Sequence, residues 1–162
     1  MPVDPHLAGL LTMLEQAGAP PLAAGTPEAG RAFYLSLTRD ARTAEQVLPV
    51  GSVEDRTVPG ADGDLRARVY RPEEDGPLPT VVFFHGGGWV IGDLDTHDNM
   101  ARSGCRGAGA VGVAVAYRLA PEHPFPAAMP GAPPAASMSR TAARCGSSGT
   151  GAPSRRDAQY AA

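Results

Sequence analysis

The sequence predicts an α/β fold, in which helices cover a mixed sheet, and three observations support this prediction. Two stretches with helical spacing of apolar residues come first, at residues 4–16 and 26–47. Two extended segments separated by a turn signal follow, at 52–59 and 65–71. A strand, a loop, a helix and a second strand then cover residues 80–117. Because a strand–helix–strand unit joins parallel strands, the expected sheet combines an antiparallel hairpin with one parallel crossover.

Each helical stretch begins with a capping residue followed by proline. Asp4 and Thr26 are the expected N-caps, because their side chains can accept hydrogen bonds from free backbone N–H groups. Proline suits the first helical position, where the N–H would be unpaired in any case. Apolar residues recur on one face of each stretch: Leu7, Leu10, Leu11 and Leu14 in the first, and Phe33, Leu37, Ala41 and Ala44 in the second.

The later strands differ in their apolar patterns. Residues 65–71 alternate between apolar residues and arginine, which is typical of a strand with one face in water. Residues 80–84 form a short apolar run, as expected of a strand buried on both faces. A helix is expected over 96–109, followed by a valine-rich strand over 110–117. Because its neighbours would be encoded later, we expect this last strand to be an unprotected sheet edge.

Composition and charge exclude several classes of protein. The chain has 162 residues, 43% hydrophobic and 19% charged, as in one globular domain rather than a disordered chain. No apolar run approaches the roughly 18 residues that span a membrane. The net charge of -3 and the lack of a basic stripe argue against a nucleic-acid partner. Because there is no signal-peptide pattern and no disulfide framework, we expect a cytoplasmic protein.

Residues 129–162 differ in composition from the rest of the chain. From Pro130 onward there is no Leu, Ile, Val, Phe or Trp, and Asp157 is the one acidic residue. Such a segment cannot bury enough apolar surface to offset the entropy of ordering it, so we expect disorder. A single frameshift near Ala128 would explain the change, and we interpret 129–162 as an out-of-frame tail.

The most informative motif is His85–Trp89, which reads His-Gly-Gly-Gly-Trp and directly follows an expected strand. Glycines allow a tight turn and let backbone N–H groups approach a ligand closely. Acyl transfer needs such donors, because N–H groups aimed at the developing oxyanion stabilise the transition state by about 3–4 kcal/mol each. Two other interpretations remain open: a purely structural turn, or a phosphate loop. Neither common phosphate-loop pattern is matched.

Two neighbouring segments also have distinctive patterns. Four acidic or imidazole side chains lie close together in sequence: Asp93, Asp95, His97 and Asp98. They could suggest a metal cluster, but their spacing fits no common ligand pattern, so we interpret them as loop-capping residues. Residues 117–128, which read YRLAPEHPFPAA, contain three prolines that fix a rigid, irregular connection. We therefore expect no metal site.

Together, residues 85–89, 92–98 and 117–128 resemble the bacterial hormone-sensitive-lipase family of α/β-hydrolases, also called the GDXG lipolytic family. The resemblance implies an α/β-hydrolase fold with an N-terminal helical cap, truncated after about four strands. Residues 1–48 would contribute cap helices, and 49–128 the N-terminal part of the hydrolase domain. Family members are serine esterases and lipases that act on carboxylic esters without a cofactor or metal, so the implied partner is a small-molecule ester.

By the same resemblance, the N–H groups of Gly86 and Gly87 would form the oxyanion hole. His85, Gly88 and Trp89 would support the loop. The family's nucleophilic serine lies in a G-D-S-A-G elbow, followed by an acid and then a histidine. This sequence has no G-x-S-x-G pattern, and its four histidines all precede the expected serine. We therefore expect an esterase by family that is inactive as written.

Other functions remain open at this stage. A non-catalytic protein that binds small molecules could use the same scaffold, and the chain could also be the non-functional product of a truncated gene. A phosphate or nucleotide binder is disfavoured, because the chain has no lysine and no helix is expected to start directly at the triple-glycine loop.

Overall fold

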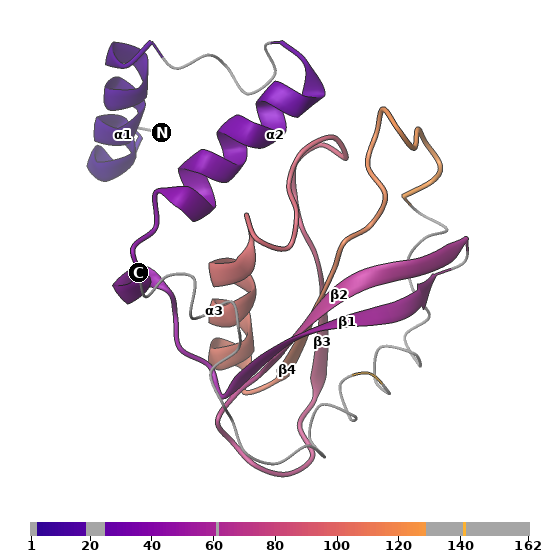
Figure 1. The fold of residues 1–162 in the computed structure, drawn as a ribbon. Coiled ribbons are helices and arrows are strands. Elements are labelled where there is room, and N and C mark those ends of the chain that lie inside the picture. The colour runs from indigo at the N-terminus through magenta and orange to yellow at the C-terminus, as the bar shows by residue number, and fades with distance from the viewer. Residues whose placement is uncertain (1–2, 19–24, 61, 129–140, 142–162) are drawn as a thin grey trace.

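Helices and strands follow one another in the predicted order (Figure 1). The structure, a computed structural model, describes residues 3–18, 25–60, 62–128 and 141. The expected disordered tail over 129–162 lies outside the described residues, apart from Thr141. The elements are the helices α1 (Pro5–Gln16), α2 (Pro27–Leu35) and α3 (Asp98–Ala108), a π-helical turn (Ser36–Asp40), a 3-10 turn (Ala44–Gln46), and the strands β1 (Ser52–Gly60), β2 (Gly63–Arg71), β3 (Thr80–Phe84) and β4 (Val111–Val115).

The four strands of the described residues form one mixed sheet in the order β1-β2-β4-β3. β1 and β2 form the predicted antiparallel hairpin, with Val58 opposite Leu65. β3 and β4 are parallel, with Thr80 opposite Val111, and α3 connects them. β4 runs antiparallel to β2 and so joins the hairpin to the crossover. The predicted α/β fold is confirmed over these strands.

The strand order corrects two expectations about burial. β4 is not an edge, because it pairs with β2 on one side and β3 on the other, and all five of its residues are buried. β3 is instead one of the two edge strands of the described sheet, with β1 at the other edge, and it is not buried on both faces, since Val81 is 46% and Phe84 47% exposed. After α3, the chain returns to the sheet and β4 takes the position between β2 and β3. Apolar composition along a strand does not reveal which neighbour fills that position.

The N-caps of α1 and α2 are as predicted. Asp4 accepts a hydrogen bond from the N–H of His6 at 2.9 Å, and Thr26 accepts one from the N–H of Ala29 at 3.3 Å. No residue of α1 is buried: on its predicted apolar face Leu7, Leu10 and Leu11 are exposed and Leu14 is half-buried. Leucine spacing therefore predicts this helix but not its packing. No described helix is both long and apolar enough to cross a bilayer.

The prediction of a single helix over 26–47 is wrong, because α2 is followed by the π-helical turn and then by the separate 3-10 turn. Two hydroxyl groups bind backbone carbonyls where the helix changes. Ser36 Oγ donates to the carbonyl of Phe33, and Thr38 Oγ1 to that of Tyr34, both at 2.7 Å. Hydrogen bonds of this kind compete with the helical pattern and bend helices.

β2 places its side chains on two buried faces of the sheet. One face holds a cluster of small and branched apolar residues: Val58, Leu65, Ala67, Val69, Val111, Val113 and Val115. On the other face, Arg68 and Tyr70 lie beneath α3 and the loop before it. The expectation that arginines of 65–71 face water is wrong for Arg68, which is 3% exposed. Its guanidinium donates to Asp55, Asp95 and Asp98 at 2.7, 2.8 and 3.2 Å.

Candidate functional site

The glycine run lies in the loop after β3, and its backbone adopts conformations that favour glycine. Gly87 has a φ of 123° and Gly88 a φ of 60°, and Trp89 continues the left-handed path with a φ of 61°. A Cβ atom on Gly87 would lie 2.0 Å from the carbonyl oxygen of Ile91 and 2.6 Å from the carbonyl carbon. Position 87 therefore requires glycine for both conformation and space.

The turn leaves several backbone donors free. The N–H groups of Val90 and Ile91 donate to the carbonyl of Gly87 at 3.1 and 3.0 Å, which closes the turn. By contrast, the N–H groups of residues 86, 87 and 88 have no hydrogen-bond acceptor within the part of the chain that the structure describes. Gly86 and Gly88 are also exposed. Free N–H donors in a loop can bind a carbonyl oxygen or an oxyanion.

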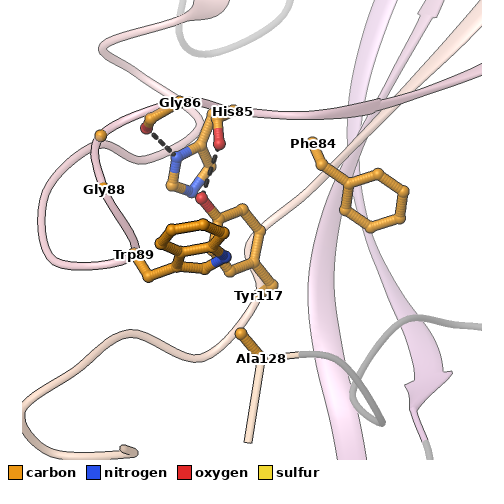
Figure 2. A pocket seen from close by; sticks show the side chains of 8 residues that line it. Phe84, His85, Gly86, Gly88, Trp89, Tyr117 and Ala128 are labelled. Carbon is orange, nitrogen blue, oxygen red and sulfur yellow. Dashed lines mark hydrogen bonds between the residues drawn. The ribbon is translucent and has the colours of Figure 1, made fainter. Parts of the chain in front are cut away.

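A pocket of about 470 Å³ opens beside this loop (Figure 2). The glycine run forms one side of it, and Phe84, Trp89 and Tyr117 contribute aromatic walls. Ala128, the last residue of the described segment, also lines it. The volume suits a small organic molecule, and the lining combines apolar surface with a few polar groups, as is common in ligand sites.

His85 is buried, 5% exposed, and stacks on Tyr117, with ring centroids 4.4 Å apart (Figure 2). Its Nδ1 lies 2.9 Å from the carbonyl oxygen of Gly86. A carbonyl can only accept, so Nδ1 carries the proton. The hydroxyl of Tyr117 donates in turn to the backbone carbonyl of His85 at 2.6 Å. Tyr117 thus contacts both the ring and the backbone of His85, a role that the sequence motif alone did not reveal.

The segment after the glycine loop packs against it. A Cβ atom on Gly92 would lie 2.5 Å from the carbonyl oxygen of Gly86 and 2.7 Å from Nδ1 of His85, so this position also requires glycine. His97 is buried next to His85, with ring centroids 5.4 Å apart. The hydroxyl of Tyr34, from α2, lies 3.5 Å from Nε2 of His97. The structure thus brings His97 to the loop, although the sequence pattern placed it only among capping residues.

The side chains first considered as metal ligands have other partners. Asp93 caps its own turn, since its Oδ1 accepts from the N–H groups of Asp95 and Thr96 at 2.9 and 2.7 Å. Asp95 and Asp98 form ion pairs with Arg68. Among the described residues, no group of three His, Cys, Asp or Glu side chains could hold a metal ion. The capping interpretation therefore fits Asp93, and ion pairing describes the other two carboxylates.

The two histidines make the stability of the fold depend on pH. Burial lowers the pKa of both His85 and His97, and the charge of His85 lowers the pKa of His97 further. An unfolded imidazole titrates near pH 6.5, so below this pH the unfolded chain binds more protons than the folded chain. We therefore expect the free energy of unfolding to change little between about pH 7 and 7.5 and to fall as the pH drops from about 6.5 toward the folded pKa values.

This pH dependence can be measured by urea unfolding at a series of pH values between about 7.5 and 5.5, followed by circular dichroism. His97→Gln should make the dependence weaker. His123→Gln is the matched control, because its side chain is exposed. If the slope of stability against pH is the same in His97→Gln and His123→Gln, burial of His97 does not contribute to the pH dependence.

Two sequence comparisons find similarity between this chain and known hydrolases. The family model described as alpha/beta hydrolase fold matches residues 81–152. The chain is 53% identical over 77 residues to the carboxylic ester hydrolase LipN of Mycobacterium tuberculosis, covering 48% of this chain and 20% of that protein. It is 36% identical over 137 residues to the ethyl acetate hydrolase of Pseudomonas putida, covering 79% of this chain and 42% of the relative.

A solved structure is also similar over most of the chain. The esterase of Pyrobaculum calidifontis matches with a TM-score of 0.67 and 40% identity, covering 80% of this chain and 40% of the esterase. The chain therefore spans less than half the length of each of these relatives.

Proposed function

The chain belongs to the α/β-hydrolase fold family, and on this basis we propose that its glycine loop is the oxyanion hole of a carboxylic-ester hydrolase. The donors are the backbone N–H groups of Gly86 and Gly87. The observation that carries the proposal is that these N–H groups have no acceptor among the described residues and border the aromatic pocket. Two relatives are named carboxylic ester hydrolase and ethyl acetate hydrolase, which supports an ester as the substrate.

The proposed chemistry is acyl transfer through a serine ester. The serine oxygen attacks the carbonyl carbon of the substrate while a histidine takes the hydroxyl proton, and the carbonyl oxygen becomes negatively charged. The bond to the alcohol oxygen then breaks, and the alcohol leaves with that proton. Water hydrolyses the acyl-serine by the same two steps. In each step the negative oxygen would lie beside the N–H groups of Gly86 and Gly87, which stabilise it.

The remaining loop residues support these donors rather than react. The Nδ1–H of His85 holds the carbonyl of Gly86, and the Tyr117 ring covers the His85 imidazole. Burial lowers the pKa of His85, which keeps the ring neutral near pH 7. Gly88 continues the left-handed path that the turn requires, and the exposed indole of Trp89 offers apolar surface to the substrate at the pocket.

The 162 residues contain no G-x-S-x-G elbow, so the serine nucleophile of this scheme has no candidate in the sequence. We therefore propose that this chain by itself does not turn over esters, and that residues 129–162 are read out of frame. A fluorophosphonate probe, which labels activated serines, should leave the purified chain unmodified. Labelling of a serine in the chain would contradict this proposal.

The decisive experiment begins with the nucleotide sequence across codons 120 to 162 and the bases beyond. We expect a second reading frame that encodes G-D-S-A-G, an acidic residue and a late histidine. The enzyme encoded by a gene restored to that frame should hydrolyse p-nitrophenyl acetate. Gly87→Ala in that enzyme should lower kcat by about 10²–10³-fold. An uninterrupted frame with no hydrolase sequence nearby, or activity unaffected by Gly87→Ala, would overturn the proposal.

A further inference from the structure

The glycine loop is connected to helix α2 through the side chain of Arg31. The Nε of Arg31 donates to the carbonyl of Val90 at 2.8 Å, and Nη2 donates to the carbonyl of Ala120 at 2.9 Å. Nη1 and Nη2 also donate to the two carboxylate oxygens of Glu122, at 2.6 and 2.8 Å. Val90 lies 59 residues and Glu122 91 residues further along the chain. The guanidinium of Arg31 thus connects α2 to the glycine loop at Val90 and to the segment from Ala120 to Glu122.

Of the two carbonyl groups that Arg31 binds, that of Val90 belongs to the hydrogen-bonded turn that carries the free donors, and that of Ala120 belongs to a separate segment hydrogen-bonded to this turn. The N–H of Val90 donates to the carbonyl of Gly87 at 3.1 Å, so the peptide groups on both sides of Val90 are held. The N–H of Ala120 donates to the carbonyl of Trp89 at 2.8 Å. Arg31 therefore closes a continuous set of hydrogen bonds around the turn, and a displacement of α2 would act directly on it.

The pair between Arg31 and Glu122 differs from an ordinary surface ion pair. Its two parallel hydrogen bonds match the planar fork of a guanidinium to a carboxylate. The hydrogen bonds from Arg31 lower the pKa of Glu122 to about 2, and the hydrogen bond with Glu122 raises the pKa of Arg31. Lysine could not make these bonds together with the two carbonyl bonds, because its ammonium is a single point charge.

We propose that Arg31 is a positioning residue of the glycine loop, which holds the turn from Gly87 to Val90 in the conformation that presents its N–H donors to the pocket. Only the use of those donors rests on the proposed function, since the contacts themselves are independent of any reaction. In an ester hydrolase, the proposal makes α2 part of the machinery that orients the oxyanion hole.

Tryptophan fluorescence and amide hydrogen exchange of the full chain can both test this proposal. Trp89 is the single tryptophan, lies inside the turn and is 66% exposed, so acrylamide quenching of its fluorescence reports on the loop. The amide protons of Val90 and Ile91 are hydrogen-bonded to Gly87, so their hydrogen exchange reports opening of the turn. The amide of Val113, in the buried strand β4, reports global unfolding.

Arg31→Met should accelerate exchange at Val90 and Ile91 by about tenfold or more and change the quenching of Trp89, while β4 exchange stays the same. Arg31→Lys should not restore protection. The matched control is Arg56→Met, which removes an exposed arginine paired with Glu54 on the same strand β1. This control should leave the loop probes unchanged.

The proposal would be overturned if the amides of Val90 and Ile91 exchanged at the same rate in Arg31→Met as in Arg56→Met. It would also be overturned if Arg31→Lys protected these amides fully. If Arg31→Met does not fold, Glu122→Gln decides, because it weakens the bidentate pair and leaves the carbonyl bonds of Arg31 in place. Glu122→Gln should accelerate loop exchange by a few-fold, and unchanged exchange would count against the proposal. No readout needs ester turnover. An inactive restored enzyme would therefore overturn the proposed function while leaving the role of Arg31 intact.

Discussion

Asp98→Ala should lower the free energy of unfolding by about 3–5 kcal/mol, the loss expected when one partner of a buried ion pair is removed. Asp98 is 4% exposed and lies at the start of α3. Its Oδ1 accepts from the Tyr70 hydroxyl at 2.9 Å and from Arg68 at 3.2 Å, and its Oδ2 accepts from Arg102 Nε at 2.7 Å. Alanine would leave two buried guanidinium groups with less compensating charge.

The loss can be measured by urea unfolding near pH 7, followed by circular dichroism. Asp98→Asn keeps the shape of the side chain and removes its charge, so its loss should be smaller than that of Asp98→Ala. Glu54→Ala is the matched control, because Glu54 pairs with Arg56 at the surface, where ion pairs contribute about 0–1 kcal/mol. A loss in Asp98→Ala as small as that in Glu54→Ala would show that the buried network contributes little.

Gly87→Ala should open the turn of the glycine loop. The new Cβ atom would meet the carbonyl of Ile91 at 2.0 Å in a conformation with φ of 123°, which only glycine adopts readily. Backbone strain of this kind costs about 1–3 kcal/mol, and the turn can avoid the clash only by breaking the hydrogen bonds to the carbonyl of Gly87. We therefore expect a loss of stability together with faster exchange at Val90 and Ile91.

Two other glycines serve as controls for this substitution. Gly88→Ala also has a left-handed φ, but no atom lies within 4 Å of its Cβ position, so only the conformational strain of about 1–2 kcal/mol applies. Gly104→Ala lies within α3 in open space and should stabilise the helix by about 0.5–1 kcal/mol. Equal stability of the Gly87→Ala and Gly88→Ala chains would mean that the contact with Ile91 relaxes without loss.

The parts of the fold that depend on local sequence could be predicted. The N-caps Asp4 and Thr26, the hairpin, the extent of β3 and the presence of β4 follow from caps, turns and apolar runs, although β4 is shorter than the expected strand over 110–117. Burial and strand order could not, because they depend on contacts between distant segments. The pattern of β2 is the same whether or not α3 lies above Arg68. The valines of β4 similarly do not reveal that two strands will flank them.

The same distinction holds for the candidate site. The run of glycines in residues 86–88 could be identified because a strand followed by consecutive glycines is a local pattern. Its surroundings come from elsewhere in the chain. Tyr117 begins the proline-rich segment 117–128, whose pattern does not show what its ring contacts, and Arg31 is a single residue in a helix with no pattern to mark it. Only the folded chain shows that both hold the loop.

The insertion of β4 between β2 and β3 also dictates an order of assembly. As the chain leaves the ribosome, β1 and β2 can pair at once, since they are adjacent in sequence. β3 emerges next but does not pair with the hairpin, because its partner in the sheet, β4, is synthesised later. Residues 111–115 must therefore thread into the gap between two existing segments before the sheet is continuous. Such non-local pairing is slow, so β3 is expected to stay unpaired, with its apolar side chains exposed, until β4 has been synthesised.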